Sequence, residues 1–188
     1  MILVFDLAKR TGWAAADRGR LPVCGEVDLI RPSMTIEEGE EEALAKLYET
    51  ALDLIGVHSP REIWIEEPMF TRDRSMLTLR FLMGLPSIVR LAAKRSGIPI
   101  YDVATGTIRL QVLGNGAAGK EGVLWWCHDN DWAVPGDNAA DALCLLAYAA
   151  CCENPLWRLT PGPNAQAARD DIFGRAKAGV RGQGRPAA

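Results

Sequence analysis

The chain has 188 residues, of which 48% are hydrophobic and 24% are charged. These values are ordinary for one globular domain that buries its core without disulfides or metals. The formal net charge is −3, whereas many DNA-binding domains are basic overall. Part of this negative charge comes from one acidic run over residues 37–42, so the net charge alone does not exclude DNA binding. The sequence shows no signal-peptide pattern and no apolar stretch of about 20 residues, so we expect a cytoplasmic protein without membrane contact.

The first 30 residues predict three strands in an antiparallel meander. Residues 2–5 form a continuous apolar run, which is typical of a strand buried on both faces. Residues 12–16 and 21–30 read as two further strands. The turn between them, over residues 17–20, contains Gly19, which tolerates a positive φ.

Two helices and a strand are expected next. Thr35 and Glu38 fit a capping box, and apolar residues then recur at helical spacing as far as Gly56. A short strand covers residues 61–66. Residues 74–96 form a helix that is apolar nearly all round, so it is buried or lies in an interface. Its Pro86 predicts a bend or a new helix start.

The remaining elements complete an α/β pattern. A strand over residues 98–103 leads into a helix that ends near Leu113, before a glycine-containing loop. A short helix covers residues 120–128, and the last long helix covers residues 138–152. This order predicts a mixed five-stranded sheet with helices on both faces.

The composition changes after Pro155. The last part of the chain is rich in Pro, Gly, Ala and Arg. We therefore divide the chain into a folded domain over residues 1–155 and a basic, flexible C-terminal tail over residues 156–188.

Carboxylates stand at the ends of predicted elements. Asp6 ends the first strand, Glu66 ends the strand over residues 61–66, and Asp141 lies one turn into the last helix. Strand ends in an α/β sheet are where ligands bind. Two carboxylates about 4 Å apart repel by roughly 4 kcal/mol at an effective dielectric of 20, so such a group needs cations. Hard oxygen donors suit Mg²⁺ or Mn²⁺, and two such ions can support phosphodiester hydrolysis.

Each carboxylate also has a structural explanation. Asp6 can cap a loop, and Glu66 or its neighbour Glu67 can be a solvated strand end. Asp137 follows Pro-Gly and makes a good helix N-cap. Asp141 lies among small apolar residues, where a purely structural role is harder to find.

A fourth ligand has two candidates. Asn138 lies three residues before Asp141 and Asp137 lies four before it, so both share its helix face. Asp137 is favoured because hard cations bind charged oxygens better than amide oxygens. Its alternative role as the N-cap leaves Asn138 open.

These features resemble the RuvC family of Holliday junction resolvases, which has an RNase H-like fold. The likeness covers about residues 1–152 and depends on the order of four motifs. They are Ile2-Leu3-Val4-Phe5-Asp6-Leu7-Ala8 with Thr11-Gly12-Trp13-Ala14, then Ile65-Glu66, then Gly114-Asn115-Gly116-Ala117-Ala118-Gly119-Lys120-Glu121, and Asn138-Ala139-Ala140-Asp141-Ala142-Leu143.

The resemblance implies a homodimeric, divalent-metal-dependent endonuclease that cuts four-way DNA junctions with two symmetric nicks, in the cytoplasm of a bacterial or phage-infected cell. It implies that Asp6, Glu66 and Asp141 bind the metal, that Lys120 lies near the scissile phosphate and that Arg109 contacts DNA.

An aromatic residue lies close to this predicted site in the sequence. Phe70 stands on the loop beyond Glu66, where it can stack on an unpaired base at the junction centre or pack on its own domain.

Three other functions remain open. The segment from Asp6 to Thr11 also resembles the first phosphate loop of actin-like ATPases, although that fold needs a second domain. A non-catalytic junction-binding module would not require the carboxylates. A nuclease of the same fold that acts on other branched DNA or on RNA–DNA hybrids differs from the main hypothesis only in its substrate.

Overall fold

The computed structural model describes residues 1–68 and 75–165, and this part of the chain forms five strands and five helices. In chain order they are β1 (Ile2–Asp6), β2 (Arg10–Ala16), β3 (Val23–Asp28), α1 (Ile36–His58), β4 (Glu62–Glu66), α2 (Met76–Arg95), β5 (Ile100–Val103), α3 (Thr105–Leu113), α4 (Lys120–Asp129) and α5 (Asp137–Glu153).

The strands form one mixed sheet in the order β3-β2-β1-β4-β5. The pairs β1–β2 and β2–β3 are antiparallel, whereas the pairs β1–β4 and β4–β5 are parallel. Phe5 pairs with Ile65, so Asp6 and Glu66, the last residues of the two strands, lie at the same edge of the sheet. The predicted meander and mixed five-stranded sheet are confirmed.

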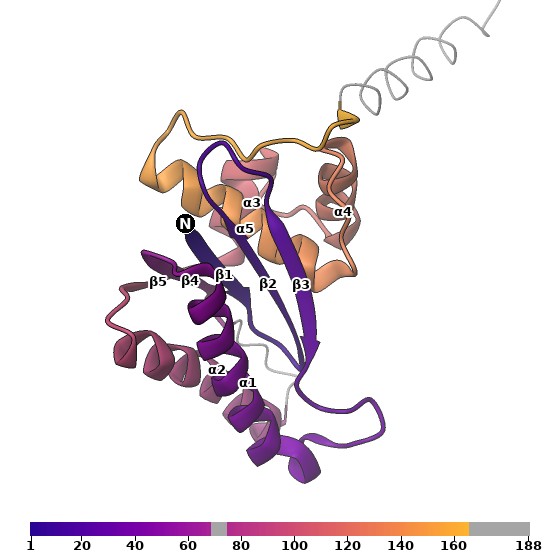
Figure 1. Ribbon diagram of the computed structural model, residues 1–188. Helices are drawn as coiled ribbons and strands as arrows, with labels where there is room; N and C mark the ends of the chain where they lie inside the picture. The colour runs from indigo at the N-terminus through magenta and orange to yellow at the C-terminus, as the bar shows by residue number, and fades with distance from the viewer. Residues whose placement is uncertain (69–74, 166–188) are drawn as a thin grey trace, which may run out of the picture.

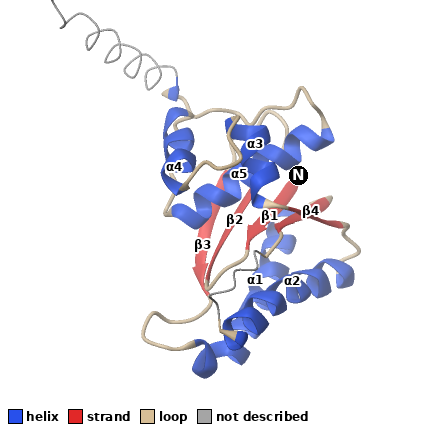
Figure 2. Cartoon of the chain, turned by 180° about the vertical axis from the view of Figure 1, so that it is seen from behind, coloured by secondary structure: helices blue, strands red, loops and turns tan. Residues whose placement is uncertain are grey.

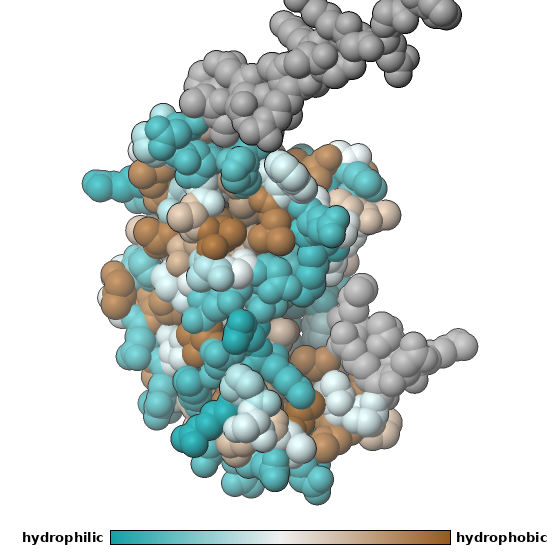
Figure 3. All heavy atoms as spheres, turned by 90° about the vertical axis from the view of Figure 1, so that its right-hand side faces the viewer, coloured by the Kyte–Doolittle hydropathy of each residue, from teal (hydrophilic) through white to brown (hydrophobic). Residues whose placement is uncertain are grey.

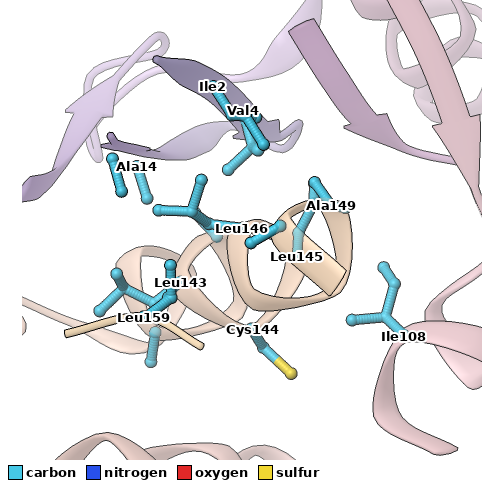
Figure 4. Packing of buried hydrophobic residues seen from close by; sticks show 14 of the residues in the cluster. Ile2, Val4, Ala14, Ile108, Leu143, Cys144, Leu145, Leu146, Ala149 and Leu159 are labelled. Carbon is cyan, nitrogen blue, oxygen red and sulfur yellow. The ribbon is translucent and has the colours of Figure 1, made fainter. Parts of the chain in front are cut away.

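Helices cover both faces of the sheet, as expected (Figures 1 and 2). Successive residues of β1 point to opposite faces, because side chains alternate along a strand. Leu3 and Phe5 pack in the layer that contains α1 and α2. Ile2 and Val4 pack against α5, whose Leu146 lies close to them in Figure 4. All four β1 side chains are fully buried, which explains the continuous apolar run.

Local signals in the sequence fix several boundaries. Thr35 and Glu38 form the expected capping box at the start of α1. Gly19 has a φ of 76° in the β2–β3 turn. Pro86, in contrast, neither ends nor restarts a helix: α2 runs through it as one helix, and the proline is buried.

Helix α2 is long and apolar enough, by length and composition, to cross a membrane, which the sequence analysis does not expect. Its Phe81, Leu85 and Val89 are fully buried in the cluster that α1 and one face of the sheet share. Its exposed side carries Arg80 and Arg90, which are paired with acidic residues of other elements. The apolar character therefore fits a core helix.

The packed structure continues beyond the boundary predicted at residue 155. Trp157 and Leu159 are buried in the same cluster as α5. The indole N–H of Trp132 donates to the Thr160 carbonyl over 3.0 Å, and the amide of Gly162 donates to the Asn130 carbonyl over 2.8 Å. Residues 156–165 therefore pack as part of the domain, because they carry large apolar side chains. Residues 166–188 lie outside the described part, so a flexible tail there stays a prediction.

This packing gives a truncation test. A chain that ends after residue 155 loses the buried Trp157 and Leu159 side chains and should be destabilised by at least about 3 kcal/mol, the cost of removing one large core side chain. A chain that ends after residue 165 should unfold at the full-length midpoint in urea. Equal stability of the two truncated chains would place the domain boundary at residue 155 after all.

Candidate functional site

The ends of β1 and β4 meet the first turn of α5 at one edge of the sheet, at its lower end in Figure 1. A cleft of about 720 Å³ opens there. The carboxylates of Asp6, Glu66 and Asp141 lie on its wall, together with Asn138 and Lys120. The structure thus brings together residues that are up to 135 positions apart in the sequence.

Asp6 lies in an environment that disfavours its ionised form. Burial, and then the negative charges of Glu66 and Asp141, raise its pKa well above the usual value, and only Lys120 acts in the opposite direction. Within the described residues, no hydrogen-bond donor or cation pairs directly with its carboxylate. Asp6 is therefore a partly buried carboxyl group without a local partner, and its ionisation is costly unless a cation binds.

Glu66 is held by Thr105, a residue that the sequence analysis did not single out. The Thr105 hydroxyl donates to Oε1 of Glu66 from the first position of α3. Burial raises the pKa of Glu66, and this hydrogen bond partly offsets the rise. Thr105 follows β5, the parallel neighbour of β4, so its position just after a predicted strand was the available signal.

Asp141 is paired with Arg109 of α3. The guanidinium Nη2 lies 2.9 Å from Oδ1 of Asp141, and Nη1 donates to the Ala118 carbonyl over 2.7 Å. Both side chains of the ion pair are largely buried. The Nε of Arg109 is the only buried side-chain nitrogen or oxygen in the described residues that has no hydrogen-bond partner. Arg109, expected to contact DNA, thus ties the glycine-rich loop to a carboxylate of the cleft.

The two candidates for a fourth ligand differ in where they point. Asp137 forms an ion pair with Lys120, which lowers the pKa of Asp137 and raises that of Lys120. Asn138 lines the cleft beside Asp141, whereas Asp137 does not. The geometry therefore favours Asn138 as the residue that faces the cleft, although the sequence analysis preferred Asp137.

The carboxylates of the cleft are not arranged as a complete set of metal ligands in this structure. In residues 1–68 and 75–165, no three Asp, Glu, His or Cys side chains are arranged so that they could hold an ion together. The contacts above give the reason, because Thr105, Arg109 and Lys120 engage Glu66, Asp141 and Asp137. These donors take part of the role that a divalent cation would have.

Two further sequence predictions concern the loop after β4. Glu67 lines the cleft and is exposed, and its amide donates to the Val103 carbonyl over 2.9 Å. Phe70, the proposed stacking residue, lies outside the described residues, so its contact with DNA stays a prediction.

Comparison with solved structures supports the same fold. A Thermus thermophilus RuvC structure superimposes with a TM-score of 0.62 and 19% identity, over 83% of this chain and 98% of that one. T. thermophilus RuvC in complex with Holliday junction substrate gives 0.61, with 18% identity over 85% and 100% of the two chains. The yeast mitochondrial Holliday junction resolvase Ydc2 gives 0.51, with 13% identity over 76% and 74%. The five-stranded sheet with helices on both faces is thus the RNase H-like arrangement expected from the sequence.

Sequence comparison identifies the family. No family model matches the chain. Two curated relatives share the name crossover junction endodeoxyribonuclease RuvC. The protein from Halorhodospira halophila is 28% identical over 169 residues, covering 86% of this chain and 96% of its own. The protein from Paramagnetospirillum magneticum is 31% identical over 147 residues, covering 76% and 84%. Because a relative above 30% identity is matched over most of its length, the chain belongs to the RuvC family of crossover junction endodeoxyribonucleases.

Proposed function

We propose that this protein is an endodeoxyribonuclease that resolves four-way DNA junctions by divalent-metal-dependent phosphodiester hydrolysis. The observation that carries the proposal is the meeting of Asp6, Glu66 and Asp141 in one cleft of a RuvC-family chain. The relatives' name, and the solved complex of one family member with a Holliday junction, support the choice of substrate.

The residues of the cleft fit a divalent metal. Their donors are hard carboxylate oxygens, which Mg²⁺ and Mn²⁺ prefer. Asp6, Glu66 and Asp141 would hold the metal, and Asp6 in particular has no donor of its own among the described residues. The fourth position would fall to Asn138 or Asp137. We infer Mg²⁺ or Mn²⁺, with two ions in each site.

Such ions, when bound, neutralise charge on the phosphodiester and activate a water. The protein's own groups then have separate tasks. Thr105 fixes the orientation of Glu66 through its hydrogen bond. Lys120, exposed at the start of α4 on the cleft wall, can neutralise a phosphate there. Arg109 holds Asp141 and the loop at Ala118, so any contact that it makes with DNA depends on release from that pair.

The substrate test is a cleavage assay with the full chain. A four-way junction, a Y-junction, a duplex and an RNA–DNA hybrid are compared with and without Mg²⁺. We expect paired nicks in the four-way junction, only with metal. Preferential cutting of another branched DNA or of the hybrid would select the alternative nuclease function. Junction binding without any metal-dependent cutting would indicate a binding module.

Asp6→Asn tests the core of the site. We expect junction binding to survive and cleavage to fall by more than about a hundredfold, the upper end of the loss when a residue that merely supports a metal ligand is removed. Glu66→Gln should behave alike. Glu67→Gln should have a milder effect, because Glu67 is an exposed residue of the same cleft. Equal losses in the two glutamate variants would show that Glu67 is as important to the site as Glu66.

The same Asp6→Asn protein should be more stable than wild type when no metal is present. The pKa of Asp6 lies above its unfolded value because of burial and like charges. The folded state therefore opposes ionisation of Asp6, and at neutral pH this costs stability. Removing the charge should raise stability by on the order of 1 kcal/mol, measured by urea denaturation in EDTA. A lower midpoint would mean that Asp6 makes a stabilising contact instead.

The fourth ligand is decided by single substitutions. If Asn138 faces the metal, Asn138→Ala should raise the Mg²⁺ concentration needed for half-maximal cleavage. Asp137→Asn would then mainly lower the melting temperature, because it loses the Lys120 pair and the carboxylate's backbone contacts at the start of α5. The reverse pattern would assign the ligand to Asp137.

We also propose that the protein is a homodimer built on α2, since two symmetric nicks require two sites. The exposed side of α2 carries Met76, Met83 and Leu91. On the face shown in Figure 3, which includes the β3 side of the sheet, hydrophobic residues lie scattered among hydrophilic ones. The proposed interface rests on these exposed apolar side chains of α2.

Sedimentation at micromolar concentration tests the dimer. Wild type should sediment as a dimer and Leu91→Glu as a monomer, because a buried unpaired carboxylate opposes association. Leu156→Glu, which alters an equally apolar and highly exposed side chain near the end of α5, is the control and should remain dimeric. A wild-type monomer that still resolves junctions would rule out the dimer.

A further inference from the structure

The start of α5 lacks an N-cap of its own. The N-cap residue is Gly136, and it makes no side-chain hydrogen bond to the helix. The first turn nevertheless carries Asp137 and Asn138, and Asp141 follows one turn later. A helix start leaves its first amides without partners inside the helix. The Asp137 carboxylate engages the backbone amides of Asp137 and Asn138, so the amide of Ala139 still needs an acceptor.

Glu26 of β3 supplies such an acceptor. Its Oε1 accepts a hydrogen bond from the backbone amide of Ala139 over 3.0 Å. Ala139 is the third residue of the helix, a position that an N-cap side chain normally reaches. The Glu26 side chain is only 10% exposed, and its other neighbour is the Arg10 guanidinium at 3.9 Å. A carboxylate from a distant strand thus caps the third amide of the helix, beside the contacts of Asp137, and also complements the positive end of the helix dipole.

Two glycines allow this close approach. A Cβ on Gly136 would lie 2.5 Å from Oε1 of Glu26, and a Cβ on Gly12 would lie 2.0 Å from the Asn138 carbonyl oxygen. Gly12 pairs with Asp6 across β1 and β2. The backbone of the first α5 turn therefore rests on the sheet directly beside Asp6.

We infer that Glu26 is a positioning residue of the proposed metal site. It does not line the cleft wall that carries the carboxylates. By capping α5 it sets where Asn138 and Asp141 stand relative to Asp6, and hence whether they can share a cation with it. The inference rests on the proposed metal-dependent function and assigns to that site a residue 20 positions beyond Asp6 in the sequence.

Three variants of the full chain separate the cap from a general effect of charge. Glu26→Ala removes the acceptor, whereas Glu26→Gln keeps an amide oxygen in its place. Asp28→Ala is the matched control, because Asp28 lies two residues further along β3 and pairs with the same Arg10, at 2.5 Å from its Nε. Within the described part of the chain, the Asp28 side chain forms no hydrogen bond or ion pair with α5.

The first readout is Mn²⁺ binding by calorimetry without DNA, and the second is the Mn²⁺ dependence of junction cleavage. Glu26→Ala should weaken Mn²⁺ binding by about tenfold and raise the Mn²⁺ concentration for half-maximal cleavage to match, as for other residues that orient metal ligands. Glu26→Gln should stay close to wild type, and Asp28→Ala should equal it.

Gly136→Ala adds a coupling test that does not depend on cleavage. The added methyl group would clash with the Glu26 carboxylate, so Gly136→Ala should weaken Mn²⁺ binding in a chain that keeps Glu26. In a chain that also carries Glu26→Ala the steric clash is absent, so Gly136→Ala should have little further effect on Mn²⁺ binding.

The outcomes are distinguishable. Wild-type affinity for Mn²⁺ in Glu26→Ala, with only a lower melting temperature, would overturn the positioning role and leave the proposed function intact. Additive effects of Gly136→Ala and Glu26→Ala would also overturn it. No Mn²⁺ binding by the wild type would overturn the proposed metal site itself.

Discussion

The mutual repulsion of Asp6, Glu66 and Asp141 is the constraint around which the rest of the structure is arranged. A sheet edge and a helix start that bring three carboxylates into one cleft are unfavourable unless cations or donors compensate. The carboxylates are held in place by packed elements, because β1 is buried on both faces and α5 packs on the sheet. Arg109 then offsets part of the charge and Thr105 donates a hydrogen bond to Glu66, whereas Asp6 has no direct partner among the described residues.

Most of the fold could be predicted because its signals are local. The capping box at Thr35, the turn at Gly19 and the apolar run of β1 each determine their own element. Two features depend on non-local packing instead. Helix α2 does not begin anew at Pro86, one of the two predicted alternatives, and Trp157 and Leu159 belong to the core although the sequence around them looks like a tail. In both cases tertiary packing overrides local composition.

The carboxylates could be found from the sequence because each lies at the end of an element, where the topology brings such ends together. Their supporting residues could not. Glu26 and Thr105 act across 113 and 39 positions, and no spacing rule connects them to their partners. The choice between Asp137 and Asn138 depends on which side chain Lys120 engages, which is likewise a tertiary contact. Sequence patterns thus predict which carboxylates come together, while the structure indicates which hydrogen bonds and ion pairs position them.

The central claim is that this cluster of carboxylates is completed by a divalent cation. The most direct measurement is the melting temperature of the wild type and of Asp6→Asn across a Mg²⁺ titration, without DNA. A ligand that binds only the folded state stabilises it in proportion to the logarithm of its concentration once the site is filled. The wild-type melting temperature should rise with Mg²⁺ and that of Asp6→Asn should stay nearly constant. An equal rise in both proteins, or none in the wild type, would contradict the account.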